Sequence, residues 1–134
     1  MNILRTPSKL LFLLLLSSCV DRDPFGLANK NILGDYYLNK WEDGKTFYLH
    51  DSKKAYEEFH DHGPIGGTVI EIGWNKNSII AKRKAHFGGK IDGWMVIDTN
   101  NKKISGPFIW ADIIKNDAFE NIEVMSSIQA WEKL

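Results

Sequence analysis

From Thr68 to Arg83 the chain reads TVIEIGWNKNSIIAKR, and this stretch decides the fold. Two runs rich in β-branched residues, Thr68–Gly73 and Ile79–Arg83, flank the polar segment WNKNS. Such runs around a short polar segment are typical of a β-hairpin, whose antiparallel strands pair with little loop entropy. The stretch therefore predicts a hairpin and, with it, an antiparallel sheet.

Two further hairpins are predicted on either side of the first. Gly34–Trp41 and Lys45–His50 are rich in aromatic residues and flank the segment EDG, whose Asp-Gly pair is a strong hairpin signal. Gly93–Asp98 and Lys102–Ser105 flank the segment TNN in the same way. Three successive hairpins favour a meander of neighbouring antiparallel strands.

The strand predicted at Gly93–Asp98 is apolar on both faces. Side chains alternate between the faces of a strand, so Trp94 and Val96 share one face while Met95 and Ile97 share the other. This pattern indicates a central strand that is buried on both sides.

Three segments show helical patterns. Ser52–His62 and Trp110–Phe119 are predicted as short helices, and Ser126–Gln129 matches a capping box that opens a last helix ending at Leu134. The alternative for the C-terminus is one helix from Asp117 to Leu134, because apolar residues recur there every third position. The expected fold class is α+β, with an antiparallel sheet of about five or six strands and short helices packed on one face.

The N-terminus has the layout of a secretory signal peptide over residues 1–18. Arg5 and Lys9 precede the apolar run Leu10–Leu16, which is too short to span a bilayer. The next residues, LSSC up to Cys19, resemble the lipobox of bacterial lipoproteins. That resemblance implies cleavage between Ser18 and Cys19 and attachment of lipid to the Cys19 thiol. The alternatives are an ordinary cysteine beside an ordinary cleavage site, or a buried apolar helix.

The expected organisation is a signal peptide (1–18), a lipidated tether (19–31) and one globular domain (32–134). Val20 follows the cysteine where some lipoproteins carry aspartate, which favours an outer-membrane protein facing the periplasm over the inner membrane. Asp21 and Asp23 leave a cell-surface location as a further alternative.

Amino-acid composition argues against some classes of partner and cofactor. The full chain balances 17 basic against 17 acidic residues, and removal of Arg5 and Lys9 with the signal leaves a slightly acidic domain, so nucleic acid is not an expected partner. Cys19 is the single cysteine, which excludes an intramolecular disulfide. No cofactor is expected beyond the covalent lipid on Cys19.

Four short pieces of the chain together resemble a known group. In order they are VIEIGWN (69–75), IIAKR (79–83), WMVID (94–98) and SGPF (105–108). The series resembles short bacterial lipoproteins that share a domain of unknown function, over roughly residues 34–119. This chain differs by an insertion at His86–Lys90 and by a longer C-terminus. The resemblance implies fold and location, and it brings no activity or catalytic residue.

Histidines form the sharpest candidate for metal binding. His50, His60 and His62 could offer imidazole ligands for zinc. His60 and His62 stand two apart at a predicted helix end, where side chains at this spacing diverge. Helix capping and solvation explain them better than a metal site. No catalytic motif is found, so the domain is predicted not to be an enzyme.

Two groups of residues are candidates for a binding interface. Lys82, Arg83 and Lys84 form a basic cluster, for which the alternative is a strand end whose lysines discourage edge pairing. Trp41 and Trp74 lie beside polar turns, where an exposed ring can anchor a protein partner, whereas core packing is the default for most tryptophans.

The expected function is a membrane-anchored, non-enzymatic module that faces the periplasm and binds a protein. A narrower alternative is an immunity or inhibitor lipoprotein that neutralises a toxin or hydrolase at the envelope. A metal-dependent enzyme is the remaining alternative, and it requires the three histidines to converge.

Overall fold

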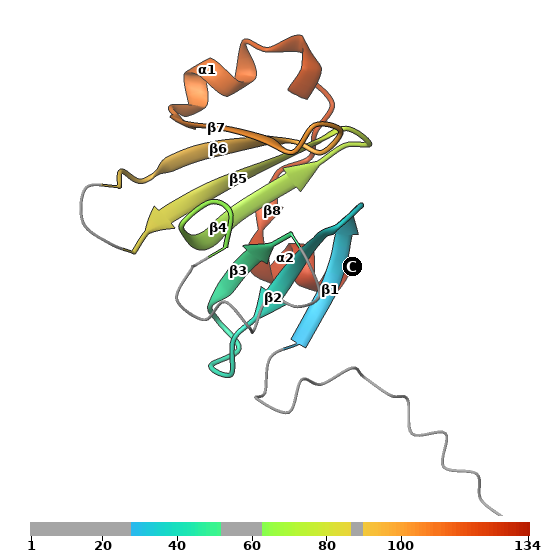
Figure 1. The fold of residues 1–134 in the computed structure, drawn as a ribbon, viewed down its shortest axis with the longest axis vertical. Coiled ribbons are helices and arrows are strands. Elements are labelled where there is room, and N and C mark those ends of the chain that lie inside the picture. Colours follow the sequence, from blue (N-terminus) through green and yellow to red (C-terminus); the bar gives the residue numbers. More distant parts are fainter. Residues whose placement is uncertain (1–27, 52–62, 87–89) are drawn as a thin grey trace, which may run out of the picture.

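The computed structural model describes residues 28–51, 63–86 and 90–134, which form two antiparallel sheets and short helices (Figure 1). The first sheet has the strand order β1-β2-β3 and the second has the order β7-β6-β5-β4-β8. The strands are β1 (Ala28–Leu33), β2 (Tyr36–Lys40), β3 (Phe47–His50), β4 (Gly67–Trp74), β5 (Ser78–Ala85), β6 (Gly93–Asp98), β7 (Lys103–Phe108) and β8 (Met125–Ser126). The helices are α1 (Trp110–Ile114), the 3-10 turn η2 (Asp117–Phe119) and α2 (Ser127–Lys133).

The α+β class with antiparallel strands is confirmed, and the three predicted hairpins are present as β2–β3, β4–β5 and β6–β7. Two details differ from the expectation. The strands divide into two sheets of three and five, because β3 and β4 are not paired with each other. The helices also lie on opposite faces of the five-stranded sheet, as the two apolar clusters below show.

The main core lies between the two sheets. Leu38, Phe47 and Leu49 of the three-stranded sheet belong to one buried cluster with Ile72 and Ile97 of the five-stranded sheet. Helix α2 completes this cluster with Ala130, and its Trp131 packs against the cluster. The domain is therefore held together by the packing of one sheet on the other, and α2 covers part of the core between them.

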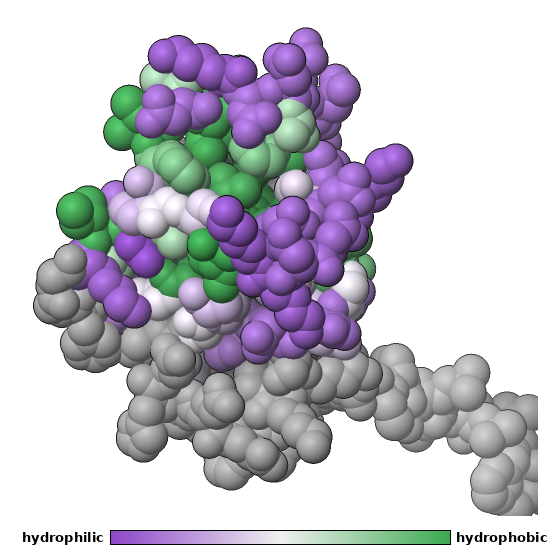
Figure 2. Space-filling model, turned by 45° about the horizontal axis from the view of Figure 1, so that its top comes forward, coloured by the Kyte–Doolittle hydropathy of each residue, from purple (hydrophilic) through white to green (hydrophobic). Residues whose placement is uncertain are grey.

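A second, smaller cluster covers the other face of the five-stranded sheet. It contains Ile80 and Trp94 from the sheet and Ile113 from α1, with Val96 packed against it. Since Met95 and Ile97 belong to the main core, β6 is buried on both faces as predicted. The outer side of α1 remains exposed, and apolar side chains lie between hydrophilic ones at this end of the molecule (Figure 2).

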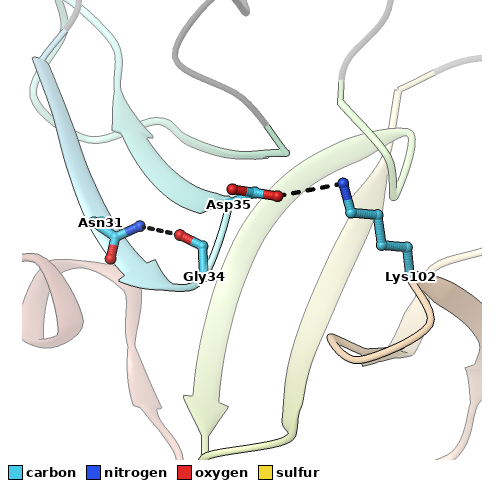
Figure 3. Close-up of polar contacts among 4 residues, drawn as sticks. All are labelled: Asn31, Gly34, Asp35 and Lys102. Carbon is cyan, nitrogen blue, oxygen red and sulfur yellow. Dashed lines mark hydrogen bonds and ion pairs between the residues drawn. The ribbon is translucent and has the colours of Figure 1, made fainter.

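The turn between β1 and β2 connects the two sheets at the surface (Figure 3). The Asn31 side-chain amide donates to the carbonyl oxygens of Gly34, at 2.8 Å, and Tyr36, at 3.1 Å. Asp35 forms an ion pair of 3.3 Å with Lys102, which lies in the β6–β7 turn. Both charged groups are well exposed, so the pair contributes little to stability.

The predicted domain start at residue 32 is four residues late, because β1 begins at Ala28. The sequence ANKN reads as tether because asparagine has low β-propensity, yet its backbone pairs with β2. Residues 28–31, which the prediction assigned to the tether, are therefore part of β1.

The C-terminal alternatives are settled by the capping box. The Ser126 hydroxyl accepts the Gln129 backbone N–H while the Gln129 side chain accepts the Ser126 backbone N–H, and α2 begins directly after Ser126. The single helix from Asp117 is therefore wrong, since η2 and β8 occupy that stretch. The helix predicted at Ser52–His62 lies outside the described residues.

Candidate functional site

A groove of about 530 Å³ lies where the two sheets diverge. Its walls come from the β2–β3 hairpin, the first half of β4, the end of β5 and the start of α2. We call it the β3–β4 groove, and the lining side chains that matter below are Trp41, Tyr48, Ile70, Lys84, His86 and Ile128.

Three of these lining residues are large, apolar and exposed. Trp41 is 38% exposed, Ile70 is 42% exposed and Ile128 is 51% exposed. They belong to the β2–β3 turn, to β4 and to α2, so only the tertiary fold brings them together. Exposed apolar side chains gathered at one concave place are a common feature of sites that bind other molecules.

Aromatic rings form one wall of the groove. The Trp41 and Tyr48 ring centroids are 6.2 Å apart at an interplanar angle of 72°, an edge-to-face contact. Tyr48 also stacks on the imidazole of His86, with centroids 6.2 Å apart and an angle of 22°. Burial, followed by the Asp43 carboxylate, raises the pKa of Tyr48 above its usual value. The wall thus consists of aromatic ring surfaces.

The β2–β3 turn forms the polar rim. The Asp43 carboxylate accepts hydrogen bonds from the Thr46 hydroxyl at 2.5 Å and from the Lys45 and Thr46 backbone N–H groups at 2.8 Å. These donors, the hydroxyl first, lower the pKa of Asp43. The carboxylate therefore holds its own turn and keeps its negative charge at the rim.

Two lysines give the groove a positive character. Lys45 and Lys84 both line it and both are exposed. Across the described parts of the chain, no carboxylate lies within ion-pair distance of either ammonium group. Lys45 acts on the pKa of Asp43 in the same rim, so Lys84 is the cation that an acidic group on a bound molecule would meet first.

The predicted basic cluster of Lys82, Arg83 and Lys84 is divided between two faces of β5. Lys84 lines the groove, and Lys82 pairs with Glu71 at 3.5 Å. Arg83 is only 6% exposed, so its assignment to a surface cluster is wrong. The period of two along a strand is the reason, because Arg83 follows Ile79 and Ala81 on the core-facing side.

Arg83 instead joins two loops. One terminal nitrogen of its guanidinium donates to the Ile65 carbonyl at 2.7 Å, and the other donates to the Ile91 carbonyl at 2.6 Å. Its Nε is buried without a partner. The side chain therefore has a structural role beneath the surface that bears Lys84.

The other predicted site residues do not lie together in the structure, or they lie outside the described residues. Trp74 is partly buried against the main core, with the Lys133 ammonium 5.8 Å from its ring, and it does not line the groove. His50 lies at the end of β3, 6.4 Å from the Tyr48 ring. His60 and His62, like Ser18 and Cys19, lie outside the described residues. Within residues 28–51, 63–86 and 90–134, no group of three potential metal ligands lies together.

Sequence reasoning missed Ile70 and Ile128. Ile70 follows the expected pattern of a half-buried strand, and its exposure comes from a shift in the β4–β5 register between Val69 and Glu71. The exposure of Ile128 follows from the exact start of α2. The register shift has no local sequence signal, whereas the start of α2 follows from the capping box.

A second exposed apolar surface lies around α1. Its members are Ile104, Phe108, Ile109, Trp110 and Ile114. The Trp110 ring lies 4.7 Å from the ring of Trp94, so part of this surface is held by the small cluster beneath it. It is separate from the β3–β4 groove, with which it shares no lining residue.

Comparisons with protein families, with curated proteins and with solved structures found no match to this chain. Among the residues that the structure describes, no helix has the length and apolar character needed to cross a membrane.

Proposed function

We propose that the chain is a lipid-anchored, non-enzymatic protein-binding module of the bacterial cell envelope, attached to the outer membrane and facing the periplasm. The observation that carries the binding part is the convergence of Trp41, Ile70 and Ile128 on the β3–β4 groove. Tryptophan is among the side chains that supply most of the binding energy in protein interfaces, and its apolar neighbours help to exclude water around it.

The sequence of the N-terminus supports the anchored part. LSSC ending at Cys19 has the form of a lipobox, and the four short pieces resemble those of short bacterial lipoproteins. Residues 20–27 separate Cys19 from β1 and span at most roughly 30 Å. An anchor of this length would hold the groove close to the membrane and raise its effective concentration toward a partner there.

The test is affinity capture of the tagged full chain from its own cells, with mass spectrometry of what it retains. We expect one protein in stoichiometric amount, and we expect Trp41→Ala to lower its retention by about tenfold or more, because a central aromatic anchor is lost. The control is Ile114→Ala, which removes a more exposed apolar side chain from α1 and should retain the partner.

Lipid attachment and membrane association are measured in the same cells. Cys19→Ala should abolish labelling by radioactive palmitate and release the chain from the membrane fraction, whereas Ser18→Ala should leave both unchanged because it keeps a small residue before the cysteine. Empty captures, from these cells and from mixtures with envelope extracts of competing strains, would contradict the binding function. A partner retained only from competing strains would identify an inhibitor of an incoming protein.

A further inference from the structure

One side of β4 is only half covered by a neighbouring strand. β5 pairs with β4 from Gly67 to Trp74, with a register shift that leaves Ile70 without a partner. On the opposite side β8 pairs only with Glu71 and Ile72. β8 stops there because Ser126 is the N-cap of α2, whose first residue, Ser127, still lies against β4. Within the described parts of the chain, residues 67–70 therefore have no strand partner on this side.

This half-covered edge lies at the β3–β4 groove. Thr68, Val69 and Ile70 all line the groove. The Ser127 hydroxyl donates to the Val69 carbonyl at 2.5 Å, which is a side-chain contact where the ladder would otherwise continue. Backbone groups at an unpaired edge are a template for a strand from another chain.

The edge carries no charge or proline that would hinder such pairing, although the register shift at Ile70 interrupts it at one end. The outer strand β7 carries Lys103 and Pro107, a charge and a missing donor that both hinder the addition of a strand. The stretch of β4 from Gly67 to Ile70 reads GTVI, with no charge and no proline. The two edges of the five-stranded sheet thus differ, and the uncharged one borders the groove.

We propose that the partner binds as an extended peptide segment that adds a strand to residues 67–70 of β4, antiparallel to β4 and in line with β8. The inference rests on the proposed function and names its mode of recognition. Four residues of β4 span roughly 13 Å, so the added strand has three or four residues in contact.

The groove also sets the chemistry of this segment. Trp41, Ile70 and Ile128 accept an apolar side chain from it. Lys84 favours an acidic side chain nearby, whereas the charge of Lys45 is partly offset by the Asp43 carboxylate in the same rim. Alternate side chains of a strand point to opposite sides, so the expected segment alternates apolar and acidic residues.

The first experiment selects random displayed heptapeptides on the full lipidated chain in detergent micelles, and it then measures the affinity of the enriched sequences as synthetic peptides. We expect enrichment of alternating apolar and acidic residues. Binding should be at least tenfold weaker for Ile70→Lys, which places a charge at the edge, and for Lys84→Glu, which reverses a rim charge. The control Ile114→Lys introduces the same charge on α1 and should bind within twofold of the unsubstituted chain.

A separate experiment tests the backbone hydrogen bonds between the peptide and β4. Methylation of peptide nitrogens removes donors, so methylating alternate nitrogens should weaken binding at least tenfold in one register and little in the other. Circular dichroism of Ile70→Lys confirms that this variant is folded, and the exposed site of Lys84→Glu gives a second variant. No enrichment, equal affinity for Ile70→Lys, or equal effects of both methylation registers would overturn the proposal.

Different results would contradict the proposed strand addition and the proposed binding function. If the protein captured from cells is retained equally by Ile70→Lys, strand addition is wrong while the binding function stands. If the captures are empty, the binding function itself is wrong.

Discussion

Arg83→Ala is expected to lower the free energy of unfolding by about 3 kcal/mol. The side chain is 6% exposed, and its guanidinium donates to the carbonyl groups of Ile65 and Ile91 at 2.7 and 2.6 Å. Its removal takes away two charge-assisted hydrogen bonds and leaves the buried Ile65 carbonyl without a donor. Urea denaturation followed by tryptophan fluorescence measures the change.

The control for this prediction is the neighbouring lysine. Lys84→Ala removes an exposed charge and should change the free energy of unfolding by no more than about 0.5 kcal/mol. Arg83→Lys keeps the charge without the planar fork that reaches both carbonyls, so it should recover only part of the loss. Equal small effects of Arg83→Ala and Lys84→Ala would return Arg83 to the surface cluster that its sequence position suggests.

Phe47→Ala is expected to cost about 3–5 kcal/mol of stability, which is the range for removing a buried phenylalanine ring. Phe47 is 2% exposed and belongs to the cluster between the two sheets. Its ring lies 6.0 Å from that of Trp131 on α2, so it joins the three-stranded sheet to the helix that closes the core. Thermal and urea denaturation should both show the loss.

The matched control is Phe108→Ala on the edge strand β7. Phe108 is 36% exposed, so removal of its ring should cost clearly less, about 1 kcal/mol. If the two substitutions cost the same, the three-stranded sheet is not packed against the five-stranded sheet as described.

Local patterns predicted most of the secondary structure and little of its assembly. The bounds of β6 agree with the predicted strand Gly93–Asp98, and the capping box at Ser126 opens α2 as expected. Hairpin turns and caps depend on neighbouring residues, which a sequence displays directly. Whether β3 pairs with β4 depends instead on packing between distant segments, and no local pattern carries that information.

The candidate site was only partly predictable for the same reason. Trp41 and Lys84 were predicted interface residues and both line the groove, whereas Trp74 and Arg83 do not. The misplacement of Arg83 was avoidable, because alternation along β5 puts it on the face of Ile79 and Ala81. The exposure of Ile70 was not, since it depends on a shift in strand register.

The most direct measurement of the binding site is hydrogen–deuterium exchange of the chain alone and with its captured partner bound. A strand added to β4 must slow the exchange of amides in residues 67–70, and contact with the aromatic wall must slow it in residues 41–48. Slower exchange at both segments is the result that we predict. Slowing confined to residues 104–114, around β7 and α1, would place the partner on the other apolar surface and contradict the account.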